Sequence, residues 1–403
     1  MNNTFTAVKN WFVSLYTVWR HEFSAIFGDV GIMLFFFALP LFYPIVYTLI
    51  YNPEMIKDMA VVVVDNSRTA ESRRLARMFD ASEFAKISGY AASLDEAKTA
   101  WKEKKCYAIL EIPANYAKKL GRGEQAHVTL YNDMSLLFRY RQFTTAATEI
   151  QLALATDMAS RRMNEIGLAG QNLAQASTPF TSEQNFTGDP TQGFASFIMP
   201  GIIVLILQQS LILGICMIAA TGADRRRRNH GYDPMWIRTS PSAIVLGKTL
   251  CYVAIYIPLV IYVLHFIPWI FSLPHYGSLA QELLLMVPFL LACCFFGQTV
   301  SVLVPDREAT FLVIVFTSVI FLFLSGLTWP RYAMNEFWLC VGDCIPSTWG
   351  VEGFVQINSD NASLYQQSRP YHALWIQTAV YFLLAIGVTA VYNRLNSPVR
   401  AKR

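Results

Sequence analysis

The sequence predicts an α-helical polytopic membrane protein with six transmembrane helices, cytoplasmic termini and an inserted α/β extracytoplasmic domain. Of its 403 residues, 54% are hydrophobic and only 15% are charged, whereas soluble domains carry about 25% charged residues. The deficit is uneven, since long stretches hold no charge and others are typical of soluble protein. The net charge of +4 is not gathered on one soluble module, so the composition gives no indication of nucleic-acid binding.

The first segment, residues 1–29, is expected to form an amphipathic (elbow) helix on the cytoplasmic side. Large aromatic residues recur at steps of three and four over residues 5–27, as in helices that lie in the membrane interface. No small-residue cleavage site follows a short apolar core, so the segment is not a signal peptide. Residues 30–51 are long and apolar enough to span a bilayer, and Pro40 and Pro44 are expected to kink this span.

Residues 52–193 are predicted to form the extracytoplasmic domain. Four helix starts are predicted. They lie at residues 65–67, at the capping box that begins with Ser93, at Pro113 and near Asp133. Strands that alternate with helices define a small α/β domain. Four apolar runs predict the strands, at residues 59–64, 84–90, 106–112 and 126–131. A Ser-, Thr-, Asn-, Gln- and Gly-rich stretch at 171–191 is typical of a linker.

The long helix near Asp133 carries a heptad-like apolar seam. Its members are Tyr140, Phe143, Ala147, Ile150 and Leu154. The seam can pack on the α/β domain itself, which we favour, or pair the chain with a second copy.

Residues 194–392 form a block of five further spans, followed by a cytoplasmic tail at 393–403. The segment 337–356 is partly apolar but contains Asp343, Pro346 and Glu352, so we expect a re-entrant or interfacial helix–turn there. The five spans are predicted at 197–220, 249–271, 283–304, 309–329 and 373–392.

The positive-inside rule sets the orientation. Basic residues flank the spans on one side only, which is therefore predicted to be the cytoplasm. The loop at 272–277 contains no Lys or Arg, as expected outside. The α/β domain also falls outside. The basic residues are Lys9, Arg20, those at 225–228, Arg238, Arg307, Arg394, Arg400, Lys402 and Arg403.

Catalytic and metal sites are not indicated. The seven cysteines form no framework, and Cys340 and Cys344 share a loop without partners at zinc spacing. If that loop is extracytoplasmic, this pair can form a disulfide, although two cysteines four apart on one helix are poorly placed for it. The stretch at 247–249 resembles the end of a phosphate-binding loop but lacks the upstream glycine.

The spans hold almost no ionisable residues, which argues against an ion-coupled transporter. Energy for transport is therefore expected to come from another subunit. The deep polar residues are the candidates for a translocation path, and they are Gln208, Gln209, Ser210, Gln298 and Ser301.

Short motifs along nearly the whole chain resemble the permease subunits of ABC-2-type exporters, in the branch with a large extracytoplasmic domain after the first helix. Each motif is weak alone, and their order and spacing carry the resemblance. Four consecutive arginines exceed what it requires, so no arginine of that run is assigned a role. The motifs lie at 19–23 before Pro40, then at 61–65, 93–97, 107–113, 120–123, 131–133, 225–228, 240–242, 246–248 and 325–326, and at Pro330 and Pro346.

The resemblance implies a partnership. Two permease copies, or a copy and a paralogue, would pair in the bacterial cytoplasmic (inner) membrane above ABC ATPase subunits, which would carry the ATP and Mg. No cofactor is expected in this chain. The contacts with the ATPase would involve Arg20, His21, Glu22, Ser240, Gly247 and Lys248. These residues can instead simply anchor helices at the interface.

Apolar spans suit a hydrophobic or amphipathic cargo, drug-like or lipid-like. The outer domain would receive cargo, dock a periplasmic adaptor or pair two copies. The alternative to an exporter permease is a membrane-anchored sensor or assembly scaffold whose outer domain binds a ligand or partner. A secondary transporter ranks behind both.

Overall fold

The computed structural model describes residues 2–51, 55–167, 193–228, 239–303 and 306–395. The chain divides into two compact units, one of Met55–Asn185 and one that joins Met1–Glu54 to Phe186–Arg403. The linker predicted at 171–191, Arg238 and the basic residues after 395 lie outside the described residues.

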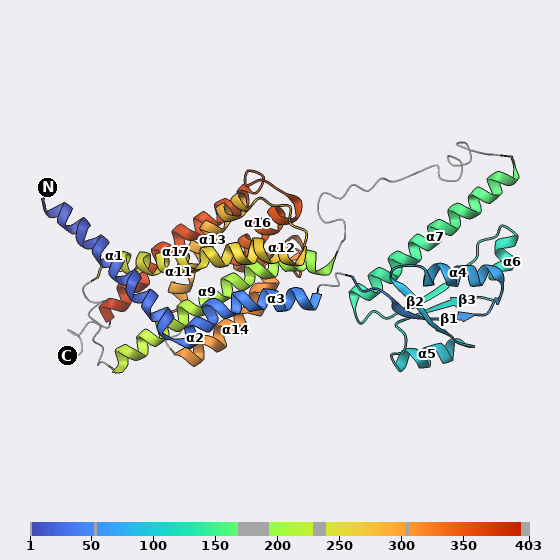
Figure 1. Ribbon diagram of the computed structural model, residues 1–403, viewed down its shortest axis with the longest axis horizontal. Helices are drawn as coiled ribbons and strands as arrows, with labels where there is room; N and C mark the ends of the chain where they lie inside the picture. Colours follow the sequence, from blue (N-terminus) through green and yellow to red (C-terminus); the bar gives the residue numbers. More distant parts are fainter. Residues whose placement is uncertain (1, 52–54, 168–192, 229–238, 304–305, 396–403) are drawn as a thin grey trace. The chain divides into compact units, whose positions relative to one another are not determined.

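The second of these, the membrane unit, holds six helical segments long and apolar enough to cross a membrane. This confirms the predicted class of α-helical polytopic membrane protein. The start of α1 and the end of α17 lie at the same end of the unit (Figure 1). Its elements are α1 (Asn2–Gly28), α2 (Val30–Met33), η1 (Leu34–Ala38), α3 (Leu39–Tyr51), α9 (Phe194–Arg228), α11 (Pro241–Ile261), η2 (Tyr262–Phe266), α12 (Ile267–Phe271), α13 (Leu279–Val300), α14 (Arg307–Leu324), η3 (Arg331–Ala333), α15 (Glu336–Asp343), α16 (Pro346–Asp360) and α17 (Ser368–Leu395).

Two helices extend well beyond their predicted bounds. α9 continues through the arginine run to Arg228 instead of ending at Ala220, because cationic side chains suit the negative end of the helix dipole. α11 begins at Pro241 rather than Thr249, since Ser240 caps it and proline fits the first helical turn. Hydropathy alone marks the apolar centre of a helix and misses such polar ends.

α9 forms the centre of the membrane unit. Its span is 83% buried, against 17% for α14 and 22% for the first span. α3, α13, α14 and α16 all pack on α9. The first span approaches it so closely that a β-carbon on Gly214 would lie 2.0 Å from the Phe36 ring. A side chain at this position would force the two helices apart.

Two spans contain a π-helical segment just ahead of a proline. η1 precedes Pro40, and η2 precedes Pro268. Proline lacks the N–H that an α-helix needs, and a π segment is one of the known sources of a helix bend. Pro44, where a second kink was expected, stays inside the α-helical segment α3.

The helix–turn expected at 337–356 is formed by α15 and α16, and α16 packs on α9, α13 and α17. Arg331 compensates the two acidic residues of this segment. Its guanidinium binds both Asp343 and Glu352, the latter at 2.9 Å. Cys340 and Cys344 are exposed and free. The Cys344 thiol instead donates to the Cys340 carbonyl at 3.4 Å.

The unit of Met55–Asn185, called the α/β unit below, contains a four-stranded sheet in the order β2-β1-β3-β4. β1 pairs in parallel with both β2 and β3, and β4 runs antiparallel to β3. The strands are β1 (Met59–Asp65), β2 (Ala85–Tyr90), β3 (Ala108–Ile112) and β4 (Thr129–Asn132), and the helices are α4 (Ala70–Asp80), α5 (Leu94–Lys102), α6 (Tyr116–Gly121) and α7 (Leu137–Glu165).

Local capping explains where the helices of this unit begin. Ser93 caps α5, as predicted, by accepting from the amide of Glu96 at 3.2 Å. α4 begins later than predicted, because Thr69 is its cap. Asp65 does not start the helix. Its carboxylate accepts hydrogen bonds from the amides of Ser67 and Arg68 in the preceding turn.

The α7 seam lies mainly against the unit's own core. Phe143 and Ile150 are buried there, with Ala147 and Leu154 packed beside them. The Phe143 ring contacts Phe79 at a centroid distance of 5.7 Å. Tyr140 is half-buried and lies outside this cluster. Pairing two copies through Phe143 would therefore require the core to open.

We expect a fragment of residues 55–167 to fold alone and Phe143→Asp to unfold it, because a buried charge without a partner is strongly destabilising. The matched control is Leu152→Asp on the same helix, where Leu152 is 67% exposed. Circular dichroism and solution mass check both variants. A folded Phe143→Asp fragment that has only lost a dimer would contradict the core placement.

Candidate functional site

A buried ion pair joins α1 to α11. Lys248 Nζ lies 2.8 Å from Glu22 Oε1, and the two side chains are 9% and 3% exposed. The Tyr252 hydroxyl donates to the other oxygen of Glu22 at 3.0 Å. Charges this deeply buried persist only where partners compensate them, so the pair fixes the register of α1 on α11.

Close backbone contact reinforces this junction. A β-carbon on Gly247 would lie 2.9 Å from both the Leu15 carbonyl oxygen and the Val18 side chain. One turn or so away, the Trp11 indole N–H donates to Ser242 Oγ at 3.2 Å. α1 is therefore bound to α11 along several turns.

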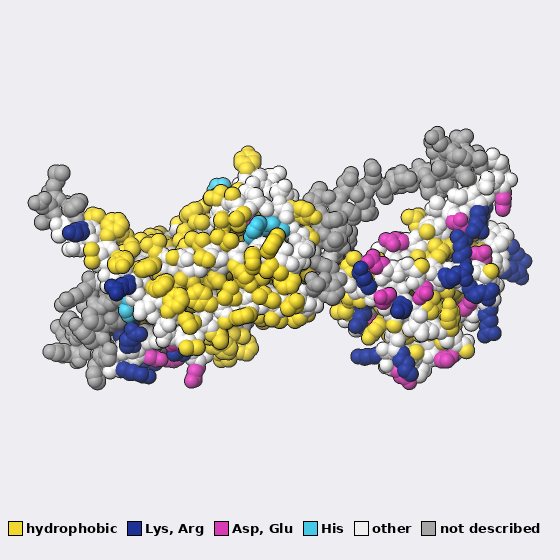
Figure 2. Space-filling view, in the orientation of Figure 1, with side chains coloured by type: hydrophobic (Ala, Val, Ile, Leu, Met, Phe, Trp, Pro, Cys, Tyr) yellow, Lys and Arg dark blue, Asp and Glu magenta, His cyan; other side chains and the backbone are white. Residues whose placement is uncertain are grey.

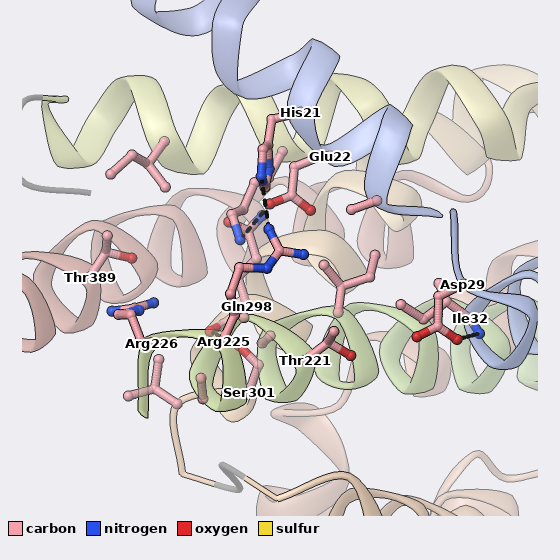
Figure 3. A pocket seen from close by; sticks show the side chains of 18 of the residues that line it. His21, Glu22, Asp29, Ile32, Thr221, Arg225, Arg226, Gln298, Ser301 and Thr389 are labelled. Carbon is pink, nitrogen blue, oxygen red and sulfur yellow. Dashed lines mark hydrogen bonds and ion pairs between the residues drawn. The ribbon is translucent and has the colours of Figure 1, made fainter. Parts of the chain in front are cut away.

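A cavity of about 320 Å³ lies beside the ion pair (Figure 3). α1, α9, α11, α13 and α17 all contribute to its lining. Its cationic groups are Lys248, Arg225 and Arg226, its acidic groups are Glu22 and Asp29, and His21 lies at its edge. α2 also contributes, through Ile32, so a movement of any one of these helices changes the shape of this cavity.

Further polar contacts link the same end of the unit across helices. The Arg225 guanidinium and His21 Nε2 are 3.3 Å apart, and Arg227 lies 2.8 Å from Asp306. Lys and Arg side chains gather at this end in Figure 2. These contacts tie the end of α9 to α1 and to the start of α14.

Asp29 has two roles at this end. Its carboxylate caps α2 by accepting hydrogen bonds from the amides of Gly31 and Ile32. The same carboxylate forms an ion pair with Arg307 at 2.9 Å. Partial burial by itself would raise the pKa of Asp29, but Arg307 and the two amides outweigh it and hold the pKa below the ordinary 3.8. The carboxylate therefore stays charged, and its contribution to stability is lost only as the pH falls below that value.

The six candidate ATPase-contact residues separate into two groups. Arg20, His21 and Ser240 are exposed. The other three are Glu22, Gly247 and Lys248, which are buried in the α1–α11 junction and cannot offer a surface to a partner. Their inward orientation could not be predicted from their positions in the sequence.

Four of the five candidate path residues are buried and paired within the bundle. Gln208 donates to Ser347 at 3.1 Å, and Ser210 accepts from Tyr256 at 2.9 Å. Gln298 donates to Thr249 at 2.8 Å, and Ser301 donates to the Gln298 carbonyl. Gln298 and Ser301 also line the charged cavity.

Gln209 differs from these four. Both polar atoms of its amide are enclosed and have no hydrogen-bond partner among the described residues. An enclosed amide without a partner costs free energy. Among the path candidates, Gln209 is therefore the one whose side chain has no hydrogen-bond partner at all within the described residues.

Two polar clusters at the opposite end were not predicted. One is Arg331 with Asp343 and Glu352, beside a cavity of about 490 Å³. The other joins His275 and Glu282, whose Nε2 and Oε1 atoms are 3.2 Å apart. In the sequence Arg331 stands near two acidic residues, and this was the available signal for the first cluster. No local pattern indicated the second cluster.

These features define a multi-pass α-helical membrane protein whose helices are joined at both ends by charged side chains. The sequence matches the family described as ABC-2 family transporter protein over residues 31–386, so the chain belongs to this family. The match runs from the first span into the last and confirms the resemblance found in the sequence. No curated protein matched the chain. The chain is thus the membrane component of a transporter.

We expect Glu22→Gln to destabilise the membrane unit by about 3–5 kcal/mol, because the buried Lys248 would lose the carboxylate of Glu22. Exchanging both charges, with Glu22→Lys and Lys248→Glu together, should recover part of this loss. The control is Lys9→Gln, at an exposed position of α1. Thermal unfolding in detergent measures all three, and an unchanged unfolding temperature for Glu22→Gln would refute a structural role for the pair.

Proposed function

We propose that this chain is the permease subunit of an ATP-driven exporter that moves a hydrophobic or amphipathic, drug-like or lipid-like substrate out of the cytoplasm or inner leaflet. The family match over residues 31–386 is the observation that carries the proposal. The ATPase is a separate subunit, which binds ATP and Mg. The membrane is the bacterial cytoplasmic membrane.

Coupling would begin at α1. Arg20 and His21 are exposed and stand next to Glu22, whose carboxylate is buried against Lys248. A partner that presses on the exposed face of α1 would move α11 with it, since the junction is closely packed around Gly247. The charged cavity would then change shape, because α1 and α11 both line it.

A substrate path would involve Gln209 rather than the paired polar residues. Its free amide lies on α9, the helix around which the bundle is packed. A passing substrate or a second permease copy would supply the missing hydrogen bonds. Gln208 and Ser210 are already paired and instead join α9 to its neighbours.

The α/β unit would face outward, where it would receive cargo or dock an adaptor. A membrane-anchored sensor or scaffold remains the second proposal, and the α/β unit with its own core is the observation that favours it. A purification from the native cells separates the two, because a sensor needs no ATPase.

We expect an ABC ATPase to copurify with the tagged chain, and Arg20→Glu to reduce this association about tenfold, or ~1.4 kcal/mol. Reversing an exposed charge at a contact removes attraction and adds repulsion. The control is Lys9→Glu, the same charge change at another exposed residue of α1. Absence of any ATPase from the wild-type preparation would favour the scaffold.

Labelling with a membrane-impermeant maleimide tests the orientation. In a Cys340→Ala, Cys344→Ala background, Lys102→Cys should react in intact cells, because Lys102 is exposed on the α/β unit. Lys9→Cys, exposed on α1, should react only after permeabilisation. The opposite pattern would show that the charge asymmetry was misread.

A further inference from the structure

A second cavity lies inside the α/β unit, on the inner side of α7. Its volume is about 710 Å³, and α4, α6, α7 and the segment before β4 line it. Cavities of roughly 300–1,000 Å³ are typical of small-molecule sites. None of the membrane helices contributes to it.

The cavity follows from the way α7 is anchored. The three buried residues of this helix, Phe143, Ala146 and Ile150, all lie in its first half. The second half is joined to α4 through the pair between Arg74 and Asp157, 3.0 Å apart. α7 therefore closes the core at one end and leaves an open space toward its C-terminus.

The inner wall of the cavity is apolar. Leu75, Phe79 and Ile150 are at most 7% exposed, and they form its deepest part. The half-buried lining continues with Leu120, Val128, Leu154 and Met158. Such a surface favours hydrocarbon, because water gains no hydrogen bonds from it.

Polar groups on α7 face the same space. Thr144 lines the cavity, and its hydroxyl oxygen is enclosed without a hydrogen-bond partner among the described residues. Arg162 lines it about five turns further along, beside Gly123, where a β-carbon would lie 3.3 Å from the guanidinium. Across the described chain, Arg162 takes part in no ion pair.

Several basic residues stand on the elements that line the cavity near Arg162, although Arg74 is paired with Asp157 and Glu71 and Glu165 also lie on α4 and α7. Figure 2 shows Lys and Arg side chains gathered over α4, α6 and the end of α7. Glu124 is the acidic residue in the cavity lining, and it lies 3.9 Å from Arg122. The basic residues on α4 and at α6 are Arg73, Arg74, Arg77, Lys118, Lys119 and Arg122.

We propose that this cavity binds an amphipathic anion, with its hydrocarbon part between α4 and α7 and its anionic head at Arg162. The apolar wall suits the hydrocarbon body of the ligand, and the guanidinium of Arg162, which has no ion-pair partner among the described residues, sets the sign of the head group. The inference goes beyond the proposed export activity, since it assigns a binding site to the α/β unit whether or not an ATPase is attached.

Photolabelling tests the site in the full chain, held in nanodiscs of phosphatidylcholine. The probe is dodecanoate with a terminal diazirine, and mass spectrometry locates the labelled peptides. Labels are expected on α4, on α7 between residues 144 and 162, or on 120–128, with at least about fivefold less labelling in Arg162→Glu. Arg161→Glu is the matched control, because Arg161 already pairs with Asp157 at 3.1 Å.

Filling the space gives a second test that leaves the charge unchanged. Ala155 lines the cavity and is exposed, so Ala155→Trp should block labelling without unfolding the unit. Leu152→Trp, on the exposed side of α7, should leave the labelling unchanged. Equal labelling in Ala155→Trp and the wild type would overturn the proposal.

Competition identifies the source of the ligand. Loss of labelling with free dodecanoate indicates a water-dispersed amphiphile, whereas loss only when phosphatidylglycerol is built into the disc indicates a membrane lipid. Either result supports the site. Labelling by the matching diazirine alcohol as strong as that by the acid, or resistance to both competitors, would rule out an anion site. None of these measurements depends on ATP hydrolysis, so they can fail independently of the exporter proposal.

Discussion

The membrane unit depends on the enclosure of α9. A helix that is 83% buried along its span has neighbours on every side, so a polar group on it that finds no partner within the protein costs free energy. Gln208 and Ser210 do so through Ser347 and Tyr256, and these contacts fix α16 and α11 against the centre. α14, with 17% of its span buried, is left with an apolar face suited to lipid.

Charge is confined to the two ends of this bundle. At the end where α1 begins and α17 ends, Glu22 pairs with Lys248 and Asp29 with Arg307. At the other end Arg331 holds two acids from α15 and α16. Removing one partner of such a buried pair is strongly destabilising, whereas the intact pair adds little net stability. They therefore specify which helices meet more than they add to stability.

Local patterns in the sequence were enough to predict most elements. The six spans follow from runs of apolar residues, and the strands of the α/β unit from short β-branched runs such as 61–64. The cap at Ser93 is also local, since its bond reaches only to Glu96. Errors were concentrated at helix ends, where the arginine run extends α9 and Ser240 starts α11 early.

The candidate site could be predicted only in part, because its decisive contacts are between distant segments. The sequence marks Glu22 and Lys248 as charges at span ends, but nothing near either residue shows that they face each other. For the same reason Gln208 and Gln209 look alike in sequence, while only Gln208 has a partner among the described residues. Depth in the membrane is readable from composition, whereas the direction in which a side chain points depends on tertiary packing.

The π segments have a consequence for the surfaces of their helices. Such a segment holds one residue more than the α-helix that it interrupts, which turns everything beyond it by about 100° relative to an uninterrupted α-helix. A single helical wheel drawn over residues 30–51 would assign the wrong face to the residues on one side of Leu34–Ala38. α2, η1 and α3 all pack on α9, and α3 beyond the π segment also contacts η2 and α12, so that this one span serves two sets of neighbours.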